Sequence, residues 1–446
     1  MWFNQALSIF FFLMYFHQFI YLFVGLFKTA KVKKKDGEEF KKHKYGVVIA
    51  ARNEELVLPY LIDSIRANNY PQELIDIIVV ADNCTDRTAD ICRERGCVVV
   101  ERHDLTKVGK GYALNYLFTK LHTEPEYANL NCEAYIVLDA DNVLTKNYIE
   151  EMNKVFDCGY DMATSYRNSK NFSANWISSG YGIWFLREAR YLNNPRMILK
   201  TSAAISGTGF LVSRKVVEEY GNWSFFCLTE DIEFSAEYVL SGRKIGYAHN
   251  AMLYDEQPTT FSQAWRQRER WAKGFYQVFG SKYARLLKSM FKNFACWDII
   301  TTIFPALLIS LLMFTVNPIC MIVAASLGET ASVEAGGYGM LSMIITLYAT
   351  LFVFGLLVEI TEWKKIKCPW YKKIFYLFTF PLFMFTYFPI AVCALFKKVE
   401  WKPIYHKHAV SIDELSSDEP DGKSEKLEEP ALVAQIENSE IGRAHV

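Results

Sequence analysis

The sequence predicts an α/β domain, built on a mostly parallel sheet with helices on both faces, that is joined to α-helical transmembrane segments. Short, continuous, β-branched apolar runs alternate with helical stretches between residues 44 and 290, which is typical of parallel strands buried on both faces. Long apolar runs lie on either side of this region. The whole chain is 51% hydrophobic and 15% aromatic, which is rich for a wholly soluble protein.

The first apolar run predicts a retained transmembrane helix within residues 1–28. Residues 3–27 carry no Asp, Glu, Lys or Arg, and about 20 apolar residues are enough to cross a bilayer. The run is too long for a signal-peptide core, and it lacks a basic start and a small-residue cleavage site. By the positive-inside rule, the lysines that follow predict that the next region is cytoplasmic. These lysines are Lys28, Lys31, Lys33, Lys34 and Lys35.

The middle region, residues 44–290, contains four predicted strands at 46–50, 76–81, 97–101 and 134–138. Helices are predicted between them, for example over 55–68 and 85–94. In open α/β sheets, ligands bind beyond the carboxyl ends of the strands. The polar motifs of this chain fall at those ends.

The second membrane region, residues 294–397, contains about three hydrophobic segments. The first, 294–327, is longer than one span and is interrupted by Pro305 and Pro318, so its start is interpreted as an interfacial helix. The second covers 338–360 and the third 374–396. The loop 361–373 carries five lysines and is expected to be cytoplasmic, whereas the loop 328–337 carries two glutamates and no lysine or arginine and is expected outside.

The third segment leaves two topologies open. If residues 374–396 cross the membrane once, the basic stretch after them lies outside, against the positive-inside rule. If Pro381 and Pro389 break the segment into a re-entrant hairpin, that stretch stays inside. Either way, the chain is expected to be a multi-pass protein of the cell membrane with a cytoplasmic middle domain.

The composition excludes some other classes. Lys+Arg (49) balance Asp+Glu (49), so no net charge points to nucleic acid. The ten cysteines include no CxxC pair, and we interpret them as small buried hydrophobes. Residues 410–446 are acidic and polar, which predicts disorder. The final EIGRAHV is what a common sequencing adapter encodes, so no function is read from it.

The first polar motifs follow the first two strands. Asn53 and Glu54 end one strand and Asp82 ends the next. Asp82 alone could simply cap a helix, but acid–amide pairs at two adjacent strand ends can hold the base and ribose of a nucleotide. Lys110 stands between two glycines before a helix, where it can neutralise a diphosphate or remain a solvated loop lysine.

A pair of carboxylates follows the fourth strand. Asp139 and Asp141 are separated by one residue directly after a buried strand. They can share one hard divalent cation, Mg²⁺ or Mn²⁺, because such ions prefer oxygen ligands and also hold substrate phosphates. A DxD run is common by chance, and its position at a strand end makes it a moderate signal.

The last motifs are Thr229-Glu230-Asp231 and, about forty residues later, QRERW. On a helix, Gln267, Arg270 and Trp271 share one face. This face offers an amide, a phosphate-binding guanidinium and an aromatic plane that can stack on a sugar. The alternative is a basic amphipathic helix on the membrane surface, which we favour for Arg266, Arg268 and Lys273.

Taken together and in this order, ARNEE, DNCTD, DAD, SGTGF, TED and QRERW resemble the family 2 glycosyltransferases, and most closely the processive synthases of poly-N-acetylglucosamine, hyaluronan, chitin and cellulose. The resemblance covers residues 44–400. It implies a GT-A fold and a UDP-sugar donor, with N-acetylglucosamine favoured over glucose.

The resemblance also implies roles for the motif residues. Asp82 would contact the uridine, Asp139 and Asp141 the diphosphate and metal, and Trp271 the acceptor. Asp231 would be the catalytic base, next to Glu230. The remaining nucleotide-sugar contacts would be Asn53, Glu54, Lys110, Gln267 and Arg270.

The implied activity is inverting transfer to a growing β-linked polysaccharide at the cytoplasmic face of a lipid bilayer. TED with QxxRW favours this over transfer of a single sugar to a lipid carrier, and product size would decide. An inactive membrane scaffold is the third reading. Only one N-terminal span is evident, where several relatives of this kind have two or more, so a complete channel would need an accessory subunit or a homodimer.

Overall fold

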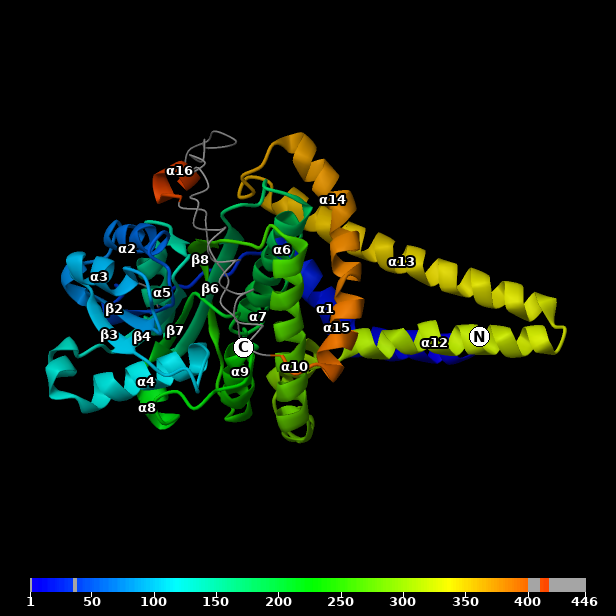
Figure 1. Cartoon of the computed structure of the whole chain (residues 1–446), viewed down its shortest axis with the longest axis horizontal. Helices are drawn as coiled ribbons and strands as arrows, with labels where there is room; N and C mark the ends of the chain where they lie inside the picture. Colours follow the sequence, from blue (N-terminus) through cyan, green and yellow to red (C-terminus); the bar gives the residue numbers. More distant parts are fainter. Residues whose placement is uncertain (1, 35–37, 400–409, 417–446) are drawn as a thin grey trace, which may run out of the picture.

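The computed structural model describes residues 2–34, 38–399 and 410–416 (Figure 1). An eight-stranded sheet lies between helices, and several long apolar helices project from one side of this domain (Figure 1). Lys35, most of the basic stretch after the third hydrophobic segment, and residues 417–446 lie outside the described residues.

The four predicted strands are confirmed as the first half of a mixed sheet. The strand order is β3-β2-β1-β4-β7-β6-β8-β5. Strands β3, β2, β1 and β4 run parallel, and so do β6 and β8, whereas β7 is antiparallel to both its neighbours and β5 to β8. The strands are β1 (Tyr45–Ala51), β2 (Ile75–Asp82), β3 (Val98–Arg102), β4 (Ala134–Asp139), β5 (Val143–Leu144), β6 (Met162–Ser169), β7 (Phe210–Ser213) and β8 (Gly246–Asp255).

The predicted helices after β1 and β2 exist but start later than expected. Helix α2 begins at Leu58 with Pro59 in its first turn, where proline needs no hydrogen-bond partner. The helices of this domain are α2 (Leu58–Arg66), α3 (Thr88–Glu94), α4 (Lys110–Thr123), α5 (Tyr148–Asp157), α6 (Trp176–Glu188), α7 (Asn194–Ile198), α8 (Arg214–Glu219), α9 (Glu230–Leu240) and α10 (Phe261–Ser289).

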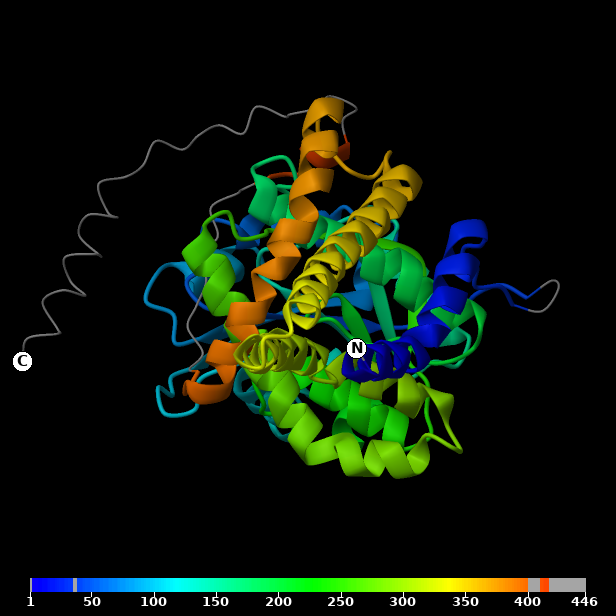
Figure 2. The same ribbon diagram turned by 90° about the vertical axis from the view of Figure 1, so that its right-hand side faces the viewer.

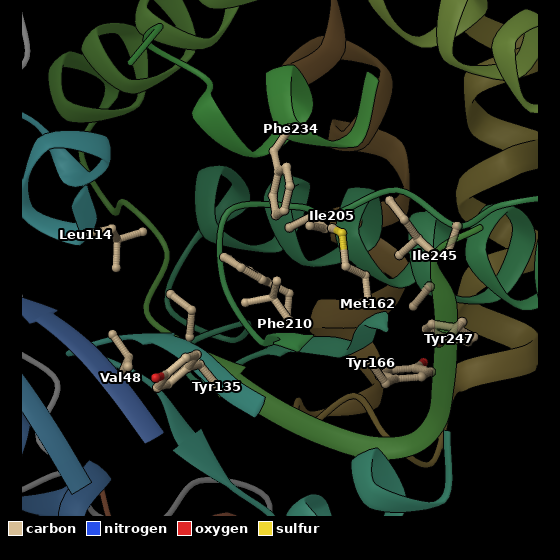
Figure 3. Packing of buried hydrophobic residues seen from close by; sticks show 14 of the residues in the cluster. Val48, Leu114, Tyr135, Met162, Tyr166, Ile205, Phe210, Phe234, Ile245 and Tyr247 are labelled. Atoms are coloured by element: carbon tan, nitrogen blue, oxygen red, sulfur yellow. The ribbon is translucent and has the colours of Figure 1, made fainter. Parts of the chain in front are cut away.

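The core occupies both faces of the sheet, as the continuous apolar runs predict. Along β1, Val48 packs in one hydrophobic cluster and its neighbours Val47 and Ile49 pack in the other, and all three are fully buried. Figure 3 shows the first cluster, where Val48 and Tyr135 of the sheet face Leu114 of α4. Burial on both faces fixes the strand ends, and therefore the polar loops that follow them.

The apolar helices are α1 (Trp2–Phe27), α11 (Phe294–Ile303), α12 (Ala306–Ser326), α13 (Thr330–Glu362), α14 (Trp370–Phe385) and α15 (Tyr387–Phe396). Helices α1, α12, α13 and the combined stretch Trp370–Phe396 are long and apolar enough to cross a membrane. Helix α11 is a separate, buried helix of 10 residues packed near α9 and α10. The chain breaks at Pro305, but Pro318 lies inside α12, so the predicted interruption there is wrong.

The predicted outer loop 328–337 is also wrong in extent. Helix α13 already begins at Thr330, so the connection after α12 is only Leu327–Glu329, with Gly328 at a φ of 78°. Glycine adopts this left-handed conformation without strain and ends the preceding helix. Glu334 therefore lies in the first turns of α13.

Helices α14 and α15 do not extend in the same direction as α12 and α13. They form a nearly continuous rod joined at Thr386, and this rod runs crosswise to the projecting helices in Figure 1. In Figure 2 the rod lies across the view, whereas the projecting helices point toward the viewer. It lies along α6 and α10 of the domain: Tyr276 Oη donates to the carbonyl of Ala391 at 3.0 Å, and Tyr376 Oη to that of Ser173 at 3.0 Å.

The predicted disorder from residue 410 is wrong for the first seven residues. Residues 412–416 form the short helix α16 (Ile412–Ser416). Ile412 and Leu415 are 8% and 6% exposed and pack on Val143 and Tyr254 of the sheet edge. The apolar pair anchors this segment in an otherwise polar sequence.

Candidate active site

A cavity of about 550 Å³ lies at the carboxyl ends of the central strands. One part of its lining comes from the polar loops after β1, β2 and β4 and from the first turns of α4 and α9. The other part comes from α1, α6, the α11–α12 junction, α14 and α15. The cavity therefore joins the predicted nucleotide site to the apolar helices.

The loops after β1 and β2 hold each other in place. Asp82 is 5% exposed and accepts a hydrogen bond from Arg102 Nη1 at 2.5 Å. Burial raises the pKa of Asp82, and Arg102 opposes that rise. Glu54 and Asp82 line the cavity. Asn53 does not: its amide donates to Thr85 Oγ1 at 3.1 Å and accepts from the Thr85 N–H at 2.7 Å, so it ties the two loops together.

Lys110 stands at the first position of α4, as the sequence suggests for a diphosphate ligand. Its Nζ pairs with Asp139 Oδ1 and donates to the carbonyl of Gly207 at 2.8 Å. Asp141 Oδ2 accepts from the N–H of Glu256 at 2.8 Å. Both aspartates line the cavity, and the Asp139 side chain is 38% exposed.

These two carboxylates fit a divalent cation that takes most of its ligands from substrate and water. Among the described residues, no group of three or more His, Cys, Asp or Glu side chains is placed to hold a metal. Mg²⁺ is commonly bound in this way, through one or two carboxylates and substrate phosphates.

Glu230 and Asp231 open α9, and both line the cavity. Thr229 takes the N-cap position, so Asp231 is not the helix cap; its Oδ2 instead faces the Ser206–Gly209 loop, 3.9 Å from the point where a Cβ on Gly207 would stand. Burial, and then the Asp231 charge, raises the pKa of Glu230 to about 7, and burial also raises that of Asp231. A carboxylate with a raised pKa is a better proton acceptor near neutral pH.

The predicted face of α10 points into the same cavity. Gln267, Arg270 and Trp271 all line it. Trp271 makes edge-to-face contacts with Tyr181 at 5.7 Å and Phe185 at 6.2 Å between ring centroids. Gly274, three residues after the QRERW motif, allows α10 to lie close to the start of α9. A Cβ on Gly274 would lie only 2.5 Å from Thr229 Oγ1.

The membrane-surface interpretation is wrong for one of the three other basic residues of α10. Arg268 is 1% exposed, and its Nη1 donates to the Phe383 carbonyl at 3.1 Å and to Thr386 Oγ1 at 2.8 Å. It thus fixes α10 to the junction of α14 and α15. Arg266 is exposed, and Lys273 Nζ contacts the Leu395 carbonyl at 3.4 Å.

Several cavity residues are absent from the sequence motifs. Arg167 of β6 and Asp255 of β8 form an ion pair, and the Arg167 guanidinium carbon lies 3.7 Å from the Phe185 ring centroid. Asp255 had a detectable signal, since it is an acid that ends a buried strand, as Asp82 and Asp139 do. The cavity residues on α6 had no such signal in the sequence, because an apolar helix face has the same composition whether it lines a cavity or packs in a core.

Comparison with known proteins agrees with this geometry. The family model for "Glycosyltransferase like family 2" matches residues 43–274. The chain is 28% identical over 285 residues to the probable glycosyltransferase YdaM of Bacillus subtilis, covering 56% of this chain and 61% of that one.

Two other relatives differ in what their names say they make. The β-monoglucosyldiacylglycerol synthase of Synechocystis is 27% identical over 239 residues, covering 52% of this chain and 48% of that one. The poly-β-1,6-N-acetyl-D-glucosamine synthase of Staphylococcus epidermidis is 25% identical over 241 residues, covering 52% and 54%. The chain thus spans about half to three-fifths of the length of these relatives. Because the family model covers more than half of the chain and its motifs meet in one cavity, this protein belongs to glycosyltransferase family 2.

Proposed function

We propose that the protein transfers a sugar from a UDP-sugar, with inversion, to a hydroxyl acceptor that enters the cavity from the membrane side. The observation that carries this proposal is the two-part lining of the cavity, which joins the strand-end loops to side chains of the apolar helices. Glu54 and Asp82 would bind the nucleoside, and Asp139 with Asp141 would hold the metal at the diphosphate. Lys110, Gln267 and Arg270 would bind the diphosphate.

Asp231 is proposed as the base. The acceptor hydroxyl loses its proton to Asp231, its oxygen bonds to the anomeric carbon, and the bond from that carbon to the diphosphate oxygen breaks. The diphosphate gains charge in this step, and Lys110 and Arg270 are cations placed to stabilise it. Mg²⁺ or Mn²⁺ held by Asp139 and Asp141 would supply further stabilisation of that charge.

A membrane lipid is the acceptor that the geometry favours. The membrane-side lining includes the apolar stretch Phe304–Leu307 and the side chains of Met384 and Ala391, which suit acyl chains better than a hydrated glycan. Helices α12 and α13 are mostly exposed, with 6% and 11% of their apolar windows buried. Among the described residues, one copy of the chain therefore does not enclose a channel for a polymer.

A growing β-linked polysaccharide, with N-acetylglucosamine or glucose as the repeating sugar, is the second candidate. A specific observation favours it: Trp271, Tyr181 and Phe185 form an aromatic cluster, and Trp184 and Tyr387 also line the cavity. Aromatic planes suit sugar rings. In this case a second copy or another subunit would have to complete the channel.

We propose a multi-pass topology in the cell membrane with three spans, α1, α12 and α13, and a cytoplasmic catalytic domain. The rod α14–α15 would lie on the membrane surface, because both of its ends contact the domain: Lys372 Nζ donates to the Ser173 carbonyl at 3.3 Å, and Lys397 pairs with Glu269 at 3.4 Å. The segment 410–416 then packs on the sheet edge. This arrangement keeps the lysines that end and follow the rod inside, which agrees with the positive-inside rule.

The test uses the purified full chain in liposomes with radiolabelled UDP-sugars, with Mg²⁺, Mn²⁺ or excess chelator. We expect metal-dependent UDP release and a short, organic-soluble labelled product. A long product that a β-glycosidase degrades would select the second candidate. Absence of turnover with every UDP-sugar in the presence of both metals would contradict the proposal, and full activity in chelator would remove the metal from it.

A further inference from the structure

Arg187 of α6 lies in the membrane-side part of the cavity without an ion-pair partner among the described residues. One Nη2–H donates to Gln18 Oε1 of α1 at 3.1 Å. The guanidinium carbon is 4.9 Å from the Trp184 ring centroid and 5.7 Å from that of Phe354 on α13. The catalytic domain thus places a cation between two apolar helices. Burial lowers the pKa of Arg187 to about 10, despite the charge of the neighbouring Glu188.

Three other arginines of this half of the molecule are compensated by carboxylates, whereas Arg268 donates to a carbonyl and a hydroxyl. Arg167 pairs with Asp255, Arg190 with Glu362 and Arg196 with Asp298. Arg187 is half-buried. A charge that has lost part of its water without gaining a counter-ion is costly, and an anionic ligand would supply the opposite charge. Arg270 fits this description for the donor diphosphate. Arg187 lines the same cavity, far along its membrane side, and has no such assignment.

The position of Arg187 along the helices is near the boundary between the hydrocarbon core and the lipid headgroups. Helix α13 has 33 residues and α1 has 26, so at about 1.5 Å per residue they are roughly 50 Å and 39 Å long, and about 30 Å of each would cross the hydrocarbon core. Phe354 and Gln18 lie eight and nine residues before the domain-side ends of α13 (Glu362) and α1 (Phe27). This corresponds to about 12–14 Å, which lies between the roughly 9 Å and 20 Å by which α1 and α13 exceed the core.

Gln18 makes this position a two-residue site. Its amide oxygen is held by Arg187, so its NH₂ group is directed elsewhere, and both side chains line the cavity. A guanidinium fork beside an amide donor matches the oxygens of a phosphate monoanion or diester. A neutral acceptor such as a diacylglycerol offers no charge for Arg187.

We propose that Arg187 and Gln18 bind the phosphate of an anionic membrane phospholipid at the membrane entrance of the cavity. This proposal rests on the proposed function only in that the acceptor enters the cavity from its membrane side. The phosphate belongs either to the acceptor itself or to a lipid that lines the entrance while a neutral acceptor reacts.

The experiment measures lipid binding separately from catalysis. Purified full chain in a phosphate-free detergent is titrated with phosphatidylglycerol or with diacylglycerol of the same acyl chains, and bound lipid is counted by native mass spectrometry. We expect tight binding of phosphatidylglycerol only. The variant Arg187→Gln should weaken it by about tenfold or more, as expected for loss of charge-assisted hydrogen bonds, and Arg187→Lys by less. Gln18→Leu is the second variant, and Arg93→Gln, at a 48% exposed arginine of α3, is the matched control.

Folding is checked by the melting temperature and by UDP affinity, which should stay near wild type in Arg187→Gln. If that variant does not fold, Gln18→Leu decides the outcome. If the phospholipid becomes labelled with sugar from the UDP-sugar, the bound phosphate belongs to the acceptor. If the phospholipid binds without becoming labelled, it is a lipid that lines the entrance. Either result supports the site. Equal binding of phosphatidylglycerol by Arg187→Gln and Arg93→Gln, or equal binding of diacylglycerol by the wild type, overturns it. Loss of all sugar transfer with normal lipid binding would instead contradict the proposed function.

Discussion

Arg196 donates two hydrogen bonds of 2.7 Å each, from Nε and Nη2, to the carboxylate of Asp298, and both side chains are 2% exposed. Tyr21 of α1 donates a third hydrogen bond to the same carboxylate at 2.8 Å. The ion pair lowers the pKa of Asp298 well below its ordinary value. One buried carboxylate thus connects the first apolar helix, the catalytic domain and α11.

Breaking this pair should destabilise the whole protein. Asp298→Asn leaves the Arg196 charge buried without its partner, which typically costs about 3–5 kcal/mol. We expect a clear drop in the unfolding temperature in detergent. Asp413→Asn removes a carboxylate from an exposed pair with Lys146 and should change it little. Equal unfolding temperatures of the two variants would show that the buried pair contributes no more to stability than the exposed pair.

Asp231→Asn should reduce sugar transfer by about 10²-fold or more, because the amide cannot take the acceptor proton. The Asp231 carboxylate accepts backbone N–H groups at the start of α9, and an asparagine oxygen can accept them too, so we expect little change in the stability of the helix end. UDP affinity and melting temperature should stay near wild type. Near-normal transfer in Asp231→Asn would require another base, and Glu230→Gln would be examined next.

Activity should fall as the pH drops below about 7. The Glu230–Asp231 pair takes up a proton more readily than ordinary carboxylates because burial raises both pKa values, that of Glu230 to about 7. A raised folded-state pKa contributes stability at low pH that is lost as the pH rises through about 7. Glu230→Gln should therefore raise the melting temperature relative to wild type at pH 8 and not at pH 4.5. A pH-independent difference would contradict the assignment.

The two ends of the α10 face should have different functions. Trp271→Ala should impair transfer to the acceptor more than hydrolysis of the UDP-sugar, because Trp271 packs with Tyr181 and Phe185 on the acceptor side. Arg270→Ala should impair both reactions, since either one leaves charge on the diphosphate. Rates of both reactions are measured with the same protein preparations. If both variants impair the two reactions equally, the face has no division of function.

The topology predicts which introduced cysteines an impermeant thiol reagent labels in intact cells, after the native cysteines are replaced. A cysteine at Glu329, between α12 and α13, should react. Cysteines at Pro125 of the domain and at Lys397, after α15, should be protected. Labelling at Lys397 with protection at Pro125 would mean that α14–α15 crosses the membrane.

The sequence alone predicts the first four strands and most of the motif residues that meet in the cavity, because both follow from local chemistry. Val47, Val48 and Ile49 form a continuous apolar run only because both faces of β1 are covered, and the acids that follow such strands must lie at one edge. The interruption predicted at Pro318 is absent because an apolar helix tolerates proline at this position.

What the sequence could not predict depends on contacts between distant residues. Arg268 looks like a surface residue of a basic helix, but it is buried by carbonyl and hydroxyl groups more than a hundred residues away. The direction of α14–α15 depends in the same way on Ser173 and Tyr276. Nothing in residues 370–396 themselves distinguishes a surface rod from a span.

The short connection after α1 has a mechanical consequence. The Ala30 N–H donates to Asn194 Oδ1 at 2.7 Å, and Asn194 Nδ2 donates to the Lys28 carbonyl at 2.9 Å. The chain thus enters the domain within three residues of the helix end, with no free stalk. In the proposed topology this attachment fixes the distance between the membrane and the reaction centre, and we expect substrates to be selected by the depth of their reactive group in the bilayer.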